Sequence, residues 1–584
     1  MCIFPWTKWI NKKESLNLPQ QEHLELETNM KPYLPQNDPH PQQRENWLNK
    51  NRKDYQFNFD YLPPLPIIQE VPTNENFSPV YLAERFPSAL SKLYANTLAI
   101  QLRSIWDPFD ELQDYEDLFP VLPTPDVIKN YQNDESFAEQ RLSGANPMVL
   151  QRITTLPPHF DFTIEQLQSQ FGHSINLEEK LQEGKMFVAD YTSLAFVEGG
   201  TYQRGRKYLP KPLAFFCWRS SGYSDYGELV PIAIQIAPEL GKQSPLLTPN
   251  SPPLVWLYAK ICVQMADANH HEMSSHLART HLVMEPFAVV TARQLAENHP
   301  LGLLLRPHFR FMLFNNDLAR KRLVNKGGIV DDLLAGTLLE SLQIAREAYF
   351  KNAQECWSLD QFSLPTEIKN RGMDDKEILR HYPYRDDGML LWEAIEEYVG
   401  NYLGLYYKNS SDLQADTELQ GWIAELVAQD GGRVKGVPQR IDTLSQLVDI
   451  VTAIIFICGP QHSAVNYTQY DYISFVPNMP FAAYQPININ PLESDIDHDY
   501  LMSFLPPPNQ AADQLQIMYG LSAYQYDRFG YYDEEFVDPE AQLIVEKFQQ
   551  RLNQIERKIE LRNKNRFVEY NYLKPSRVLN SISI

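Results

Sequence analysis

Histidines recur at a regular spacing between residues 271 and 308 of this 584-residue chain. Four residues separate His271 from His276, and four separate His276 from His281, with His299 and His308 farther along. A single histidine in an apolar helix is ordinarily a core residue. Several are harder to explain that way, because unpaired imidazoles are costly to bury and neutral imidazole is the commonest metal ligand. The spacing therefore indicates a metal site.

The first three histidines lie in a segment that we expect to be one buried helix. Residues 254–284 are mostly apolar and contain neither Pro nor Gly. In a regular α-helix, positions five apart are rotated by about 140°, so His276 and His281 would point away from a common metal. A π-bulge widens the turn and occurs at functional sites. We therefore predict a π-bulge between His276 and His281.

A second polar pair follows another apolar segment. Residues 447–458 are apolar all round and too few to span a bilayer, which predicts a core helix. His462 and Asn466 come directly after it and, four residues apart, share one face of a helix. The alternative interpretation is a helix end with an incidental histidine.

Taken together, these segments resemble the signature of the lipoxygenases. The matching segments are THLVMEPF at 280–287, HPLGLLLRPHFR at 299–310, QHSAVNYTQYDY at 461–472 and the terminal NSISI at 580–584, with RLSGANP at 141–147 and ELQGW at 418–422. The resemblance extends over about residues 60–584.

The resemblance implies that one metal is held by the side chains of His276, His281, His462 and Asn466 and by the terminal carboxylate of Ile584. It places His271 in the second shell, near the metal. Nitrogen and oxygen ligands without thiolate, with one position open, suit one non-haem iron per chain. Manganese fits the same ligands.

The chemistry that the resemblance implies is dioxygenation of polyunsaturated fatty acids. Ferric iron with a bound hydroxide removes a hydrogen atom from the methylene of a 1,4-pentadiene unit, O2 adds to the radical, and a fatty acid hydroperoxide results. Linoleate, linolenate or a longer polyene is the expected substrate.

Three residues of the segment 314–330 match positions of the substrate and oxygen pocket in this family. Ala319 stands where lipoxygenases have Ala or Gly, and Ala resembles the enzymes that usually form S products. Leu323 matches a leucine beside the reactive methylene, and Val330 matches an aliphatic residue of the pocket wall. Arg219 and Arg306 are candidate anchors for the fatty acid carboxylate, and the sequence favours neither.

The fold expected is mainly α: a large helical catalytic domain over residues 61–584, with the metal on a long central helix. Short β-prone segments at 186–197, 212–218 and 229–237 predict a small antiparallel β subdomain. Residues 1–60 are expected to form a flexible or loosely packed arm. This arm is too short for the N-terminal lipid-binding barrel (PLAT type) of many lipoxygenases, so we expect a single-domain, bacterial-style form.

Net charge and cysteine content indicate which partners the protein can bind and in which compartment it works. The formal net charge of −22 argues against nucleic-acid binding, because phosphate recognition needs a basic surface. The five cysteines are scattered and form no CxxC motif, which suits a reducing compartment. We expect a cytoplasmic protein that is peripheral at membranes, with transient contact.

The sequence leaves three alternative functions open. The first is an iron-dependent dioxygenase. The second is the same fold with manganese, or with hydroperoxide isomerase activity dominating. The third, of a different class, is a non-catalytic lipid-binding protein. The presence of all five ligands, Ile584 included, favours the first.

Overall fold

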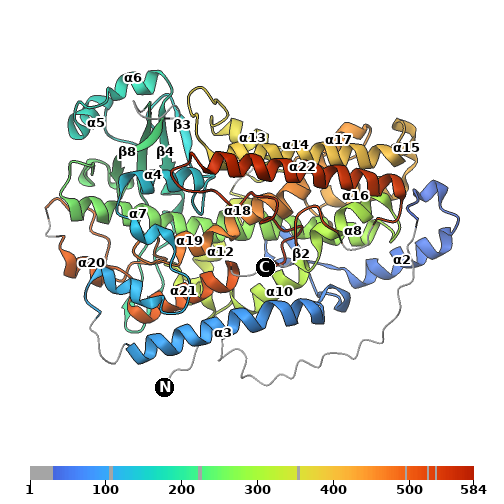
Figure 1. The fold of residues 1–584 in the computed structure, drawn as a ribbon, viewed down its shortest axis with the longest axis horizontal. Helices are drawn as coiled ribbons and strands as arrows, with labels where there is room; N and C mark the ends of the chain where they lie inside the picture. Colours follow the sequence, from blue (N-terminus) through green and yellow to red (C-terminus); the bar gives the residue numbers. More distant parts are fainter. Residues whose placement is uncertain are drawn as a thin grey trace.

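The protein is mostly helical, with a small β-sheet at one end (Figure 1). The computed structural model describes residues 31–584 apart from 104–108, 221–226, 352–355, 494–495, 523–524, 526 and 533–535. Several helices surround the central part of the protein. In chain order they include α3 (Pro79–Arg103), α10 (Met312–Arg322), α11 (Ile329–Leu333), α12 (Leu338–Tyr349), α16 (Thr417–Val427) and α21 (Pro508–Ser522).

A long central helix crosses the core. It begins as α7 (Pro253–His270), continues as a π-helix over His271–Leu282, and ends as α8 (Val283–Gln294). Every residue of α7 from Val255 to Asn269 is buried. The predicted buried helix and its π-bulge are therefore confirmed, and the π-helical part is longer than a single widened turn.

A second set of helices covers the central one. α14 (Pro383–Tyr406) packs against α17 (Leu444–Phe456) and α22 (Pro539–Asn563), and these three lie along the upper part of Figure 1. A π-helix over Ile457–Gln461 joins α17 to α18 (His462–Asn466), which continues into α19 (Thr468–Ile473). This arrangement brings α18 against the π-helix of the central segment.

The helical stretch Leu444–Ile473 is the one among the described residues that is long and apolar enough to cross a membrane by length and composition. However, 72% of its most apolar window is buried inside the protein. It is therefore the core helix that the sequence predicts.

The antiparallel β subdomain is confirmed, with strand order β3–β4–β7–β8. Its strands are β3 (Gln151–Ile153), β4 (Met186–Asp190), β7 (Leu213–Arg219) and β8 (Glu228–Gln235). β4 is shorter than expected, because the carboxylate of Asp190 accepts hydrogen bonds from the backbone and hydroxyl of Thr192 and the chain turns there.

Residues 31–60 are packed against the helical domain. α2 (Pro41–Asp54) contacts α8, and its buried Arg44 forms ion pairs with Asp38 at 2.6 Å and with Glu418 of α16. These contacts join residues 31–60 to the helical domain, and the flexibility expected of the arm stays a prediction. Residues 1–30 lie outside the described residues, and the boundary at residue 60 stays a prediction.

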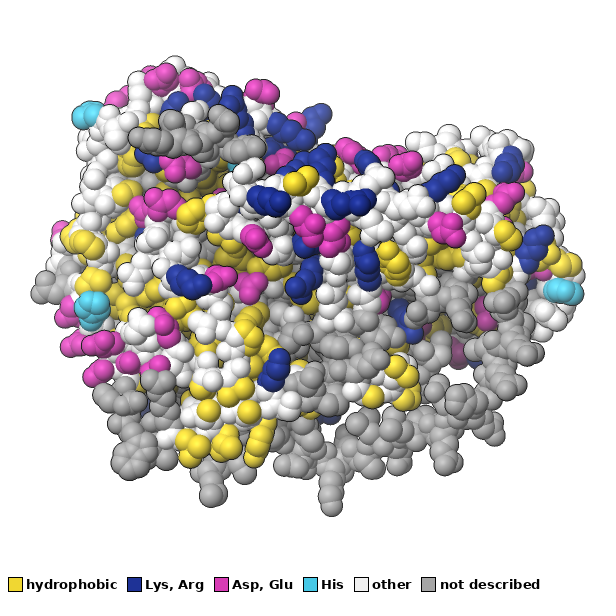
Figure 2. Space-filling model, in the orientation of Figure 1, with side chains coloured by type: hydrophobic (Ala, Val, Ile, Leu, Met, Phe, Trp, Pro, Cys, Tyr) yellow, Lys and Arg dark blue, Asp and Glu magenta, His cyan; other side chains and the backbone are white. Residues whose placement is uncertain are grey.

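The outer surface in this orientation mixes side chains of both charges. Figure 2 shows acidic and basic side chains interspersed over the face, with hydrophobic side chains between them. The three histidines His276, His281 and His462 are buried in the interior.

Candidate metal centre

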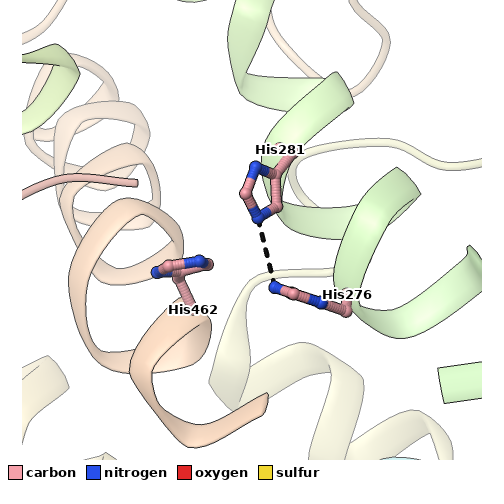
Figure 3. A group of neighbouring side chains, drawn as sticks. All are labelled: His276, His281 and His462. Carbon is pink, nitrogen blue, oxygen red and sulfur yellow. Dashed lines mark hydrogen bonds between the residues drawn. The ribbon is translucent and has the colours of Figure 1, made fainter. Parts of the chain in front are cut away.

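Three histidines predicted as ligands converge in the core. His276 and His281 come from the central π-helix and His462 from α18, and their ligand atoms lie within 4.8 Å of one another. Figure 3 shows the three rings turned toward a common space between the two helices. Nε2 of His281 lies 3.1 Å from Nε2 of His276. The arrangement matches the spacing argument made from the sequence.

The local sequence explains why the central helix is widened at this point. Pro286 has no N–H to give to the carbonyl of Leu282, and Leu282 is the last π-helical residue. The hydroxyl of Thr280 donates to the carbonyl of His276, a bond that competes with the regular backbone ladder. The π-helix thus ends where an α-helical hydrogen bond is unavailable.

A second π-helix that contains a proline comes directly before His462. Pro460 lies inside the second π-helix, Ile457–Gln461, and lacks the N–H that a regular helix would pair with Phe456. His462 is the first residue of the regular helix that follows. Both π-helices therefore place a histidine at or near their ends.

Burial keeps the three imidazoles neutral. Burial, with a smaller contribution from His276, lowers the pKa of His281 to about 3. Burial also lowers the pKa of His276, against the opposing carboxylate of Glu272, and lowers the pKa of His462 well below its usual value. Neutral imidazoles offer a nitrogen lone pair, which is the form that binds metals.

The two remaining predicted ligands lie beside this cluster. Asn466 is fully buried one helical turn after His462, where its amide donates to the carbonyl of Leu521 and accepts from Gln469. Ile584 is 3% exposed, and its main chain is close enough to His462 to raise the pKa of that imidazole. Both positions suit the predicted roles, which stay predictions.

Hydrogen bonds hold the terminal segment in the core. Leu579 N donates to the hydroxyl of Ser463 at 3.3 Å, next to His462. Nδ1 of His308 donates to the carbonyl of Asn580 at 2.8 Å. This hydrogen bond ties His308 to the terminal segment.

Two other histidines have structural partners as well. Nε2 of His271 lies 2.9 Å from the carbonyl of Val465, which ties the π-helix to α18 beside Asn466. His299 pairs with Asp416 at 3.0 Å, and both side chains are fully buried.

One residue of the site was not predicted from the sequence. The carboxylate of Glu272 approaches Nδ1 of His271 at 3.3 Å and Nδ1 of His276 at 3.9 Å.

A small cavity of about 10 Å³, roughly the size that holds one water molecule, lies beside the π-helix. It is lined by Tyr61, Leu277, Leu282, Asn316, Ala319, Arg320, Val324 and Leu342. Leu277 and Leu282 each follow a histidine of the cluster, so the apolar wall and the cluster share one helix. Tyr61 and Leu342 carry no signal in the sequence, since they come from distant segments.

The predicted pocket residues are placed differently from one another. Ala319 lines the pocket. Leu323 and Val330 are partly buried against the core and do not line this cavity. The neighbouring residue Val324 lines it. The backbone N–H of Val330 donates to the carbonyl of Leu323 at 3.1 Å, so the chain turns back on itself between these two residues.

Neither candidate carboxylate anchor lines this pocket. Arg219 pairs with Glu228 on the β7–β8 hairpin at 2.6 Å. Arg306 donates to the carbonyls of Glu297 and Ala296.

The donor set fits a first-row transition metal. Among the described residues, neither ring nitrogen of His462 has a partner at hydrogen-bond geometry, although the ring is fully buried. Metal–nitrogen bonds of about 2.1 Å at right angles would place two imidazole nitrogens about 3 Å apart, close to the His276–His281 separation. A buried cluster of three imidazoles is the kind of donor set with which proteins bind a transition metal without thiolate.

Comparison with known proteins identifies the family. The Lipoxygenase profile matches residues 13–573. The chain is 33% identical over 509 residues to the allene oxide synthase-lipoxygenase protein of Plexaura homomalla, covering 82% of this chain and 46% of that protein. It thus spans about half the length of that relative. It is 30% identical over 568 residues to the polyunsaturated fatty acid lipoxygenase ALOX15B of Homo sapiens, covering 94% of this chain and 81% of that one.

The fold agrees with these matches. The chain aligns with an anaerobic crystal structure of "delta413-417:GS LOX" in complex with arachidonate at a TM-score of 0.87 and 31% identity, covering 95% of this chain and 84% of that one. The chain belongs to the lipoxygenase family. Lipoxygenases are non-haem iron enzymes of the dioxygenase class, and the three buried histidines of this chain could hold a metal ion.

Proposed function

We propose that this protein is a non-haem iron dioxygenase that inserts O2 into the 1,4-pentadiene unit of polyunsaturated fatty acids and releases fatty acid hydroperoxides. The observation that carries the proposal is the convergence of three buried histidines in a chain that belongs to the lipoxygenase family. Linoleate, linolenate and longer polyenes have the required unit.

The proposed ligands are the imidazoles of His276, His281 and His462, the amide of Asn466 and the carboxylate of Ile584. When bound, iron supplies the one-electron oxidant that a methylene between two double bonds requires. A ligand set of nitrogen and oxygen atoms supports iron, and manganese is the alternative that the same atoms suit. Metal analysis of the purified protein distinguishes the two.

The protein's own task in this reaction is to place the substrate and exclude water. Leu277, Leu282 and Leu342 line the small cavity next to the π-helix, and we infer that this cavity widens to hold part of a fatty acyl chain when substrate binds. The small side chain of Ala319 leaves space at the wall that α10 contributes. We infer that this space governs where O2 meets the substrate radical.

We also infer transient contact with a neutral lipid surface, through helix α3. Tyr94, Leu98 and Leu102 recur every four residues, which places them on one face, and are 61%, 46% and 61% exposed. The net charge of −22 disfavours anionic membranes. Co-sedimentation with phosphatidylcholine vesicles should weaken in Leu98→Glu, and equal binding by both proteins would contradict this contact.

Incubation with linoleic and α-linolenic acid tests the proposed function. We expect conjugated-diene absorbance and oxygen uptake, with about one iron per chain in the same sample. Full metal occupancy without diene formation would point instead to hydroperoxide isomerase activity. Protein that binds no metal would favour the non-catalytic lipid-binding alternative.

A further inference from the structure

A hydrogen-bonded network connects His281 with the wall of the pocket. Nδ1 of His281 lies 2.9 Å from Oδ1 of Asn316, a buried residue of α10. Nδ2 of Asn316 donates to the carbonyl of His281 at 3.1 Å and to Oε2 of Glu285 at 2.9 Å. Asn316 therefore contacts both the ring and the main chain of His281.

The partners of Asn316 determine which way its amide points. A carbonyl oxygen and a carboxylate oxygen only accept hydrogen bonds, so the NH2 group must face His281 O and Glu285. The amide oxygen must then face Nδ1 of His281, which has to carry the proton. Nε2 of His281 is consequently the nitrogen with the free lone pair, and it faces His276.

Glu285 is held in place by two further donors. Its Oε1 accepts from the backbone N–H of Ile68, at the end of β2 (Leu65–Ile68), at 2.8 Å. Its Oε2 accepts from Nη1 of Arg320 at 2.8 Å. A fully buried carboxylate without such partners would strongly destabilise the fold. The network is thus anchored from α8, α10 and β2 together.

The network also reaches the substrate side of the site. Arg320 and Asn316 line the pocket with Ala319, and the guanidinium of Arg320 lies 5.9 Å from the ring centre of Tyr61, another lining residue. The side chains that hold His281 and the side chains that form the pocket wall are therefore partly the same.

We propose that Asn316 and Glu285 are positioning residues, which fix the proton and the ring orientation of His281, and that Arg320 couples them to the pocket wall. This proposal rests on the proposed function, since it assumes that His281 is an iron ligand. Outer partners of this kind typically change metal affinity or activity by about 10–100-fold when they are removed.

Asn316→Leu tests the proposal, because leucine has a similar volume and offers no hydrogen bond. We expect the affinity for iron, measured by chelator competition, to fall by about 10–100-fold. The electron paramagnetic resonance spectrum of the ferric form should change, since the position of a ligand changes. If Asn316→Leu fails to fold, Asn316→Ala should show the same two effects, because it also removes the acceptor for the Nδ1–H group of His281.

A double-mutant cycle separates the network from a general loss of stability. Glu285→Gln alone should weaken iron binding, and Glu285→Gln combined with Asn316→Leu should be no worse than Asn316→Leu, because Glu285 acts through Asn316. Glu425→Gln is the matched control, since Glu425 pairs with Arg293 of the same helix α8 at 2.6 Å, away from His281. It should leave iron affinity and the ferric spectrum unchanged.

The outcomes distinguish this proposal from the proposed function. A folded Asn316 variant with wild-type iron affinity and an unchanged ferric spectrum would overturn the positioning role. Independent, additive effects of the two substitutions would overturn the coupling through Asn316. Wild-type protein that binds no iron and forms no diene would overturn the proposed function itself.

Discussion

At the scale of single residues, the histidines are distinguished by their partners. His299 and His308 are paired with Asp416 and Asn580, whereas among the described residues neither nitrogen of His462 has a partner at hydrogen-bond geometry, although the main chain of Ile584 lies close to this ring. A buried imidazole without a partner is costly unless it binds something. His462 is therefore the residue whose removal should affect the metal most clearly.

His462→Ala should abolish iron binding and reduce dioxygenase activity below detection. Iron content and oxygen uptake are measured on the same folded preparation. His381→Ala is the control, because His381 pairs with Glu139 at 3.0 Å outside the cluster and should keep its iron. Retention of iron by His462→Ala would show that the histidine cluster is not the metal site.

Ala319→Gly should change the product rather than the rate. Ala319 lines the pocket, and removal of its methyl group frees space at the wall beside the proposed metal centre. We expect the position or the chirality of the hydroperoxide to shift, as seen by chiral chromatography of the products from linoleate. An unchanged product profile would remove Ala319 from the control of oxygen addition.

At the scale of elements, two π-helices and the terminal segment assemble the site. The spacing of His276 and His281 allowed the first π-helix to be predicted, because a regular helix would separate them. Its length and the second π-helix were not predictable from the spacing of the histidines. The contact of α3 with the terminal segment has no signal in the sequence.

Tyr81 of α3 holds the residue before Ile584. Its hydroxyl donates to the carbonyl of Ser583 at 2.6 Å, and Tyr81 is fully buried. Tyr81→Phe should destabilise this contact by about 1–3 kcal/mol, because a buried carbonyl loses its donor. We expect iron to dissociate faster and the terminal residues to become more accessible to carboxypeptidase.

Tyr115→Phe is the matched control for Tyr81→Phe. Tyr115 is also buried, and its hydroxyl donates to the carbonyl of Pro506 at 2.7 Å, far from Ile584 in sequence. It should lower stability by a similar amount without faster loss of iron. Equal iron release from both variants would mean that Tyr81 acts only through general stability.

At the scale of the whole molecule, the sequence predicts the class of fold well. The helical domain, the small antiparallel sheet and the buried helix over 447–458 follow from apolar periodicity and strand propensity. The packing of residues 31–60 does not follow from such local patterns, because it depends on contacts such as that of Arg44 with Glu418. The lining of the cavity does not follow from them either, because Tyr61 and Leu342 come from distant segments. Long-range pairs of this kind leave no local pattern.

The metal-free protein should lose stability in acid, partly through His308. Burial lowers the pKa of His308 to about 4, whereas an unfolded histidine titrates near pH 6.5. As the pH falls through 6.5, the unfolded chain takes up a proton that the folded chain does not, so stability decreases until about pH 4. The loss from this one group is roughly 3 kcal/mol at most.

The comparison of wild type with His308→Gln isolates this contribution. The midpoint of thermal unfolding, measured between pH 7 and pH 5, should fall less steeply for His308→Gln than for wild type. Equal slopes for the two proteins would contradict a buried, neutral His308.

The fate of molecular oxygen tests the central claim most directly. Purified protein with bound iron is incubated with linoleic acid under oxygen-18 gas, and the product is analysed by mass spectrometry. A dioxygenase places both atoms of one O2 molecule in the hydroperoxide, so we predict a product with two oxygen-18 atoms. A product without the label, or turnover without oxygen uptake, would contradict the assignment as a fatty acid dioxygenase.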